Sequence, residues 1–147
     1  MQTPSKRLSH DEYFLSMLQL VASRSTCIRR AVGAIIVDEK HHVLSTGYNG
    51  VPSGFPHCID KQCAGALDPP GVSFRCLAVH AEVNAVLQCP RIGLAHTLYV
   101  SCAPCFSCAK MICNTPLKRI VCLEPYADDS SWLFAKAGIK LEIGGQR

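Results

Sequence analysis

The stretch Val79-His80-Ala81-Glu82-Val83-Asn84-Ala85 opens an apolar run that continues to Gln88. Its pattern is typical of an amphipathic helix. A histidine and a glutamate two residues apart can point into one cavity only if the helix begins there and its first turn faces inward. We therefore predict a helix over residues 79–88 whose first turn presents an imidazole and a carboxylate to the same cavity.

A second group of candidate ligands follows at Pro104-Cys105-Phe106-Ser107-Cys108. Two cysteines at this spacing can bind one tetrahedral metal ion from a tight turn or a helix N-terminus. With His80 they make three ligands, and a three-ligand zinc site keeps its fourth position for water, as catalytic zinc sites do. Glu82 is then a carboxylate beside the site that is not a ligand and can move protons. The two motifs together predict a catalytic zinc ion.

The two motifs match the H-x-E…P-C-x-x-C signature of the zinc-dependent nucleoside and nucleobase deaminases. Within that family the sequence resembles the deoxycytidylate (dCMP) deaminase branch in residues 47–54, 80–85 and 105–110, and the resemblance runs from about Tyr13 to Ile143. It implies hydrolysis of dCMP to dUMP and ammonia, a step in pyrimidine deoxynucleotide metabolism. It also implies that Glu82 carries the protons.

The resemblance further implies a set of substrate contacts. Asn49 is expected to contact the sugar hydroxyl, since one amide offers both a donor and an acceptor. Ala81 is expected at the substrate, and Tyr126 near its phosphate. Arginine suits bidentate phosphate contacts, so Arg24, Arg29 or Arg30 could bind the 5′-monophosphate, and we select Arg29. Ordinary surface solvation is the alternative for any one of these arginines.

The loop Gly47-Tyr48-Asn49-Gly50 follows a predicted strand. Glycine and asparagine tolerate positive φ, so simple turn chemistry is one interpretation. A loop that leaves the end of a strand is also where an α/β sheet places its ligand contacts. The resemblance implies that the activator dCTP and the inhibitor dTTP bind near this loop, and that the enzyme is a homohexamer.

A long irregular segment, residues 55–77, is broken by proline and glycine and shows little periodicity. Such an insertion in a compact domain needs something to hold it. Cys27, Cys58, Cys63 and Cys76 resemble the ligands of a second, structural zinc ion in bacterial and phage deoxycytidylate deaminases, with His57 as the substitute for one of them. Four unrelated buried thiols are the alternative.

Helical and strand patterns alternate along the chain and predict one domain over residues 1–147, an α/β/α sandwich with a mixed sheet of about five strands. The resemblance implies the same cytidine deaminase-like fold. A helix is expected after the N-cap Ser9, with Glu12 completing a capping box. Further helices are expected over residues 105–114 and 129–137, and strands over 31–38, 43–46, 97–101, 119–123 and 139–143. The first two strands should form an antiparallel hairpin.

The amino-acid composition limits the class of protein to which the chain can belong. With 48% apolar and 18% charged residues, the chain is expected to be globular rather than disordered. It contains no run long enough to span a bilayer and no signal-like start, so we expect a cytoplasmic protein without a membrane partner. Ten cysteines then indicate reduced thiols and metal rather than a secreted disulfide scaffold.

Two other functions stay open. A deaminase of bases in tRNA or single-stranded nucleic acid would share the metal motif, but tRNA adenosine deaminases usually have glutamate where this sequence has Ala103. A basic groove studded with aromatic residues is also not apparent, so no nucleic-acid partner is expected. A zinc-stabilised binding module without turnover is the third possibility, although a closed structural site would have no use for Glu82.

Overall fold

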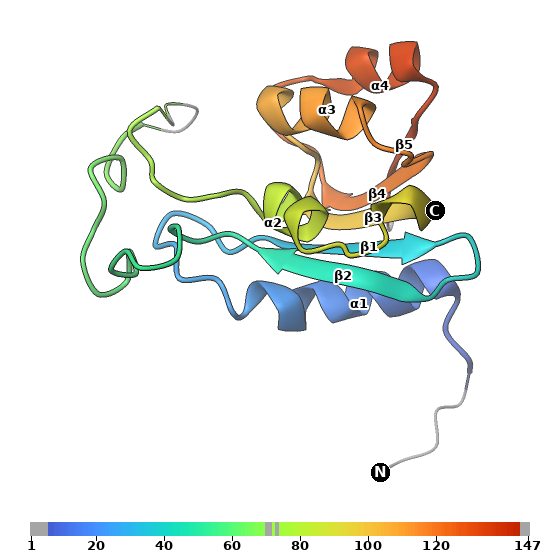
Figure 1. Ribbon diagram of the computed structural model, residues 1–147, viewed down its shortest axis with the longest axis horizontal. Helices are drawn as coiled ribbons and strands as arrows, with labels where there is room; N and C mark the ends of the chain where they lie inside the picture. The colour runs from blue at the N-terminus through green and yellow to red at the C-terminus, as the bar shows by residue number, and fades with distance from the viewer. Residues whose placement is uncertain (1–5, 70–71, 73, 145–147) are drawn as a thin grey trace.

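The computed structural model describes residues 6–69, 72 and 74–144. Five strands form one mixed sheet in the order β2-β1-β3-β4-β5. One face carries α1 and the other carries α2, α3 and α4 (Figure 1), which confirms the predicted three layers. The elements are α1 (His10–Ala22), β1 (Gly33–Asp38), β2 (Val43–Tyr48), α2 (Ala81–Leu87), a 3-10 helix η1 (Ile92–Leu94), β3 (Ala95–Cys102), α3 (Phe106–Cys113), β4 (Arg119–Glu124), α4 (Ser131–Ala137) and β5 (Lys140–Ile143).

Strand direction brings two loops together. β1 pairs antiparallel with both β2 and β3, whereas β3, β4 and β5 run parallel. The last paired residues of β3 and β4 are Cys102 and Glu124. Because parallel strands end at the same edge of a sheet, the segments that follow, which contain Cys105 and Tyr126, leave the sheet side by side.

Alternation along the central strands builds a core on each side of the sheet. On the α1 side, Phe14 and Leu18 pack against three fully buried strand residues, Ile35, Val37 and Tyr99. On the other side, the larger core joins the sheet to α2, α3 and α4. The described helices include none long and apolar enough to cross a bilayer.

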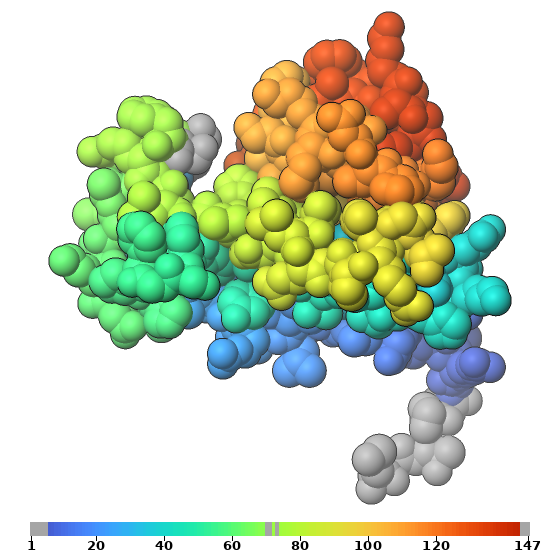
Figure 2. Space-filling model, in the orientation of Figure 1, coloured from blue at the N-terminus to red at the C-terminus, as the bar shows by residue number. Residues whose placement is uncertain are grey.

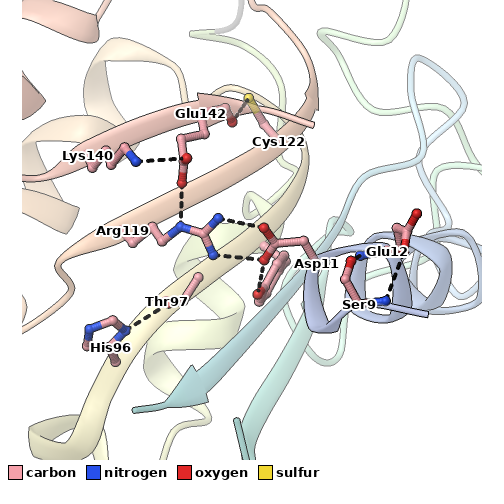
Figure 3. A network of polar contacts seen from close by, with 10 residues as sticks. Ser9, Asp11, Glu12, His96, Thr97, Arg119, Cys122, Lys140 and Glu142 are labelled. Carbon is pink, nitrogen blue, oxygen red and sulfur yellow. Dashed lines mark hydrogen bonds and ion pairs between the residues drawn. The ribbon is translucent and has the colours of Figure 1, made fainter. Parts of the chain in front are cut away.

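A polar network fastens α1 to the sheet (Figure 3). Ser9 and Glu12 form the predicted capping box at the start of the helix. The Asp11 carboxylate accepts hydrogen bonds from Arg119 Nη1 and Nη2, at 2.8 and 2.6 Å, and from the Tyr99 hydroxyl at 2.7 Å. The hydrogen bonds from Arg119 are the main reason why the pKa of Asp11 is lowered to about 2. The network joins the first helix to two central strands.

The insertion (residues 51–78) lies between β2 and α2. Its described residues contain no helix or strand, as predicted. An isolated bridge between Gly50 and Val79 closes its base, and the amide of Ile59 donates to the carbonyl of Thr26 at 3.2 Å. The insertion forms the green lobe beside the sheet in Figures 1 and 2. Its two ends are therefore held together next to the start of α2.

Candidate active site

Two helix N-termini meet beyond the ends of β3 and β4. His80 is the N-cap residue of α2, and Cys105 is the N-cap residue of α3. The helix predicted over residues 79–88 thus begins at Ala81, and its first turn places Glu82 inward, where only 4% of its surface is exposed. Cys108 follows in the first turn of α3 and is also buried.

The structure brings the three predicted ligands together. The Nδ1 atom of His80 lies 3.5 Å from Cys105 Sγ and 3.3 Å from Cys108 Sγ, and the three atoms all lie within 4.8 Å of one another. A tetrahedral zinc ion with usual bond lengths needs N···S separations of about 3.5 Å. The spacing and the chemistry of the donor set therefore both fit zinc.

The electrostatics of the two thiols also favour a metal ion. A hydrogen bond from the Cys108 thiol is the main reason why the pKa of Cys105 is lowered to about 4, and His80 contributes further. Cys105 thus offers a thiolate at neutral pH, which is the form that binds metal. Its position at the start of α3 adds the favourable end of the helix dipole.

Glu82 lies beside the three candidate ligands but is not one of them. Burial raises the pKa of its carboxyl group, while the charge of His80 acts in the opposite direction. A buried carboxyl group with a raised pKa binds a proton more readily than an exposed one. This is the property that a proton carrier needs.

The loop after β4 forms a wall of the site. Asp128 Oδ2 accepts a hydrogen bond of 3.2 Å from the amide of Phe106 at the start of α3, and Ser130 Oγ donates to the carbonyl of Pro104 at 2.7 Å. These two contacts hold the loop that contains Tyr126 against the start of α3. Burial raises the pKa of Tyr126, and the charge of Cys105 raises it further, which is consistent with a phenol group near the ligands. Figure 2 shows a notch between the insertion and the part built by α3 and α4, with the start of α2 at its base.

Residues 8–124 match the family described as the cytidine and deoxycytidylate deaminase zinc-binding region. The chain belongs to this deaminase family. It is 43% identical to the deoxycytidylate deaminase of Mycobacterium phage D29 over 76% of this chain and 91% of the phage protein. It is 38% identical to the deoxycytidylate deaminase of Saccharomyces cerevisiae over 92% of this chain, but spans only 45% of the yeast protein.

A solved structure of the deaminase family has the same fold. The dCMP deaminase of cyanophage S-TIM5, in complex with dCMP and dUMP, superposes with a TM-score of 0.76 at 25% identity. The match covers 94% of this chain and 99% of the phage enzyme. The cytidine deaminase-like fold expected from the sequence is thus confirmed.

Of the residues that the resemblance places at the substrate, Asn49 and Ala81 are buried. Asn49 is 6% exposed; its Oδ1 accepts from the amide of Val32 at 2.8 Å and its Nδ2 donates to the carbonyl of Arg30 at 2.7 Å. One donor hydrogen and one lone pair remain for a ligand. Ala81 is fully buried, so a contact with substrate would come from its backbone.

Arg29 has partners that the sequence did not suggest. Its Nη1 donates to the carbonyls of Gly65 and Val72, both at 3.0 Å, and its Nη2 to that of Pro69 at 3.2 Å. The guanidinium therefore fastens the insertion to the segment before β1. A phosphate contact from Arg29 stays a prediction, and it would require these carbonyls to be released.

The four cysteines of the predicted second site interact at the base of the insertion. A hydrogen bond from the backbone of Leu77 is the main reason why the pKa of Cys63 is lowered, and the thiols of Cys58 and Cys76 lower it further. Burial raises the pKa of Cys76, and both Cys63 and Cys27 add to that effect. Within the described part of the chain, only the first site brings three ligand atoms within 4.8 Å, so this second cluster is the looser one.

Sequence reasoning missed the two residues that anchor the wall of the site, Asp128 and Ser130. The run Asp128-Asp129-Ser130-Ser131 does carry a local signal, since aspartate and serine favour helix starts. Asp129 follows that rule, because its Oδ1 accepts from the amide of Ser131 at 3.0 Å. Asp128 instead binds the start of the preceding helix, 22 residues away, and local patterns do not indicate such a partner.

Proposed function

We propose that this protein is a zinc-dependent deoxycytidylate deaminase that converts dCMP and water into dUMP and ammonia. The observation that carries the proposal is the set of His80, Cys105 and Cys108 around one point, with the buried carboxyl group of Glu82 beside it. The names of the phage and yeast relatives and the ligands of the cyanophage enzyme support dCMP as the substrate.

Each residue of the site has a role in this reaction. His80, Cys105 and Cys108 hold zinc, which, when bound, lowers the pKa of a water molecule and so makes a nucleophile available at neutral pH. Glu82 takes a proton from the attacking water and delivers it to N3 of the cytosine ring as the water oxygen joins C4. It then carries the second water proton to the C4 amino group, which leaves as ammonia. One carboxylate can serve both transfers because it stands next to the ligand set.

The proposal is tested by offering dCMP, CMP, deoxycytidine, cytosine and a tRNA anticodon stem separately and following ammonia release. We expect kcat/KM for dCMP to exceed that for deoxycytidine by at least about tenfold. The reason is that loss of the phosphate removes charge-assisted hydrogen bonds worth roughly 1.5–3 kcal/mol each.

The other outcomes separate the alternatives. Equal efficiency on dCMP and deoxycytidine would indicate a nucleoside deaminase. Ammonia from the tRNA stem alone would favour a nucleic-acid deaminase. Absence of turnover on every substrate, in protein that retains zinc, would favour a binding module.

We propose that the phosphate of dCMP binds beside Tyr126, on the loop that follows β4. Arg30 supports this placement because its charge acts on Tyr126, lowering the phenol pKa against the larger effect of burial. The Arg30 guanidinium forms an exposed ion pair with Glu124 at 2.8 Å. An exposed pair of this kind contributes little to stability, so a phosphate group can replace the carboxylate at low cost.

We also propose that Cys27, Cys58, Cys63 and Cys76 bind a second, structural zinc ion. Support comes from the hydrogen bonds that lower the pKa of Cys63, since a donor to sulfur favours the thiolate that zinc requires. The ion would draw the looser cluster into a closed tetrahedral shell and hold the insertion to the segment before β1.

Elemental analysis should then find two zinc ions per chain. Cys63→Ala is expected to lose one ion and lower the Tm while the other ion stays, because a structural zinc contributes folding energy. The control is Cys89→Ala, which alters a buried cysteine outside both clusters and should retain both ions. One ion in the wild type, together with rapid alkylation of Cys63 in the folded protein, would overturn the second site.

We propose further that the protein is a single domain over residues 1–147 that assembles as a homohexamer in the cytoplasm. The ten cysteines are all unpaired thiols, which suits a reducing compartment. We place regulation by dCTP and dTTP at residues Gly47-Tyr48-Asn49-Gly50, of which the first two end β2 and the last two begin the loop that follows it. The support from this chain is that Gly50 is hydrogen-bonded directly to Val79, the residue before His80.

A further inference from the structure

The first turn of α2 carries both His80 and Glu82, and the end of β2 holds that turn in place. Ser45 Oγ donates to the carbonyl of Ala85 at 2.7 Å within the buried interface. Gly50 and Val79 exchange two backbone hydrogen bonds, of 3.2 and 2.8 Å. These contacts fix the start of the helix and its inner face against β2 and the loop that follows it.

Asn84 adds a contact of a different kind at the outer side of this turn. Its Nδ2 donates to the carbonyl of Tyr48, the last residue of β2, at 2.8 Å. The amide of Asn84 also donates to the carbonyl of His80 at 3.0 Å. A shift of Asn84 is therefore transmitted to the candidate metal ligand through one hydrogen bond.

Helix geometry makes the contact relevant to Glu82 as well. Successive residues of an α-helix are about 100° apart around its axis, so Asn84 lies roughly 200° from Glu82, almost on the opposite side. A tether on one side of a short helix restrains its rotation about the axis. Rotation is the motion that would swing the carboxylate of Glu82 away from the zinc ligands.

We propose that Asn84 is a positioning residue: through the Tyr48 carbonyl it fixes the orientation of the first turn of α2, and with it His80 and Glu82. This inference rests on the proposed function. The chemistry is specific to asparagine, because the partner is a carbonyl oxygen, which needs a donor at short reach. Aspartate has the same shape but is ionised at neutral pH and offers only acceptors, so it would repel that oxygen.

The test compares Asn84→Ala and Asn84→Asp with the wild type, and uses Gln88→Ala, at the exposed end of the same helix, as the matched control. Three quantities are measured: kcat and KM for dCMP, the rate of zinc release to a chromophoric chelator, and the Tm. We expect kcat to fall about tenfold in both Asn84 variants with KM within about threefold, because misplacement by a fraction of an ångström is enough to slow the chemical step.

Zinc release should become several-fold faster in both Asn84 variants, since His80 is held less firmly. The Tm should fall by no more than about 4 °C, as expected for one exposed hydrogen bond. The inference is overturned if kcat and zinc release stay at wild-type values, or if Gln88→Ala reproduces both changes. If the wild type does not deaminate dCMP, the proposed function fails, and the comparison of zinc release alone decides the role of Asn84.

Discussion

Replacement of Glu82 by glutamine is expected to lower kcat for dCMP by about three orders of magnitude, while zinc content and folding stay close to those of the wild type. Glutamine has nearly the same size and can hydrogen-bond, but it cannot take up and release a proton. General acid–base catalysis typically contributes about 10²- to 10⁴-fold, and here one carboxylate performs both transfers. Ammonia release and elemental analysis of the same preparation give the two quantities.

Two comparisons make this result specific. Glu39→Gln removes an exposed carboxylate in the turn between β1 and β2 and should leave kcat unchanged. Cys105→Ala and His80→Ala should lose zinc and activity together, because each removes a ligand. Complete loss of zinc from Glu82→Gln would contradict its assignment as a proton carrier and make it a ligand or a purely structural residue.

Replacement of Gly47 by alanine is expected to lower the free energy of unfolding by about 3 kcal/mol or more, which corresponds to roughly 10 °C in Tm for a chain of this size. A Cβ atom on Gly47 would overlap the carbonyl oxygen of Ala81 and the amide nitrogen of Ala85, and would lie 2.9 Å from the Cα of Ala85. Those are backbone atoms of α2, so no side-chain rotation relieves the overlap. The helix must move, and His80 and Glu82 must move with it, so most of the activity should be lost as well.

Gly93→Ala is the matched control for Gly47→Ala. A Cβ atom on Gly93 has nothing within 4 Å, so the change should alter the free energy of unfolding by no more than about 0.5 kcal/mol. Thermal unfolding followed by circular dichroism compares the two variants directly. Equal Tm values for both would mean that α2 can move away from β2 freely, and would remove the basis for treating this contact as rigid.

The ligand set was predictable from sequence because its information is local. His80 and Glu82 share one turn, Cys105 and Cys108 share another, and apolar patterns place each turn at the start of a helix. The mixed sheet of about five strands and its three layers followed from the alternation of elements, whereas the order of the strands in the sheet was not predicted. Boundaries shifted where a single contact decides them: the strand predicted to end at Thr46 continues to Tyr48, since Gly47 has no side chain to keep α2 away.

The hydrogen-bond partners of individual side chains could not be predicted from the sequence. Arginine suits phosphate, and the sequence therefore offers Arg29 as a phosphate contact, but a guanidinium also binds carbonyl oxygens. Its observed partners lie 36 to 43 residues further along the chain. A local sequence pattern gives the chemical type of a side chain. It does not indicate which backbone groups, distant in the sequence, the fold brings next to that side chain. The same limit applies to Asp128 and to the contact of Asn84 with Tyr48.

The hydrogen bonds that attach α1 to the sheet determine when this helix can become fixed during protein synthesis. Asp11 is bound by Tyr99 and Arg119, which lie 88 and 108 residues later in the chain. At a synthesis rate of about 5–20 residues per second, Arg119 leaves the ribosome roughly 5–20 s after Asp11. During that interval the apolar side of α1 can pack against the nascent β1–β2 hairpin, but the hydrogen bonds between Asp11 and Arg119 cannot yet form. The helix α1 is thus fastened only after β4 has been synthesised, and nascent chains that stop before β4 should present this helix to chaperones.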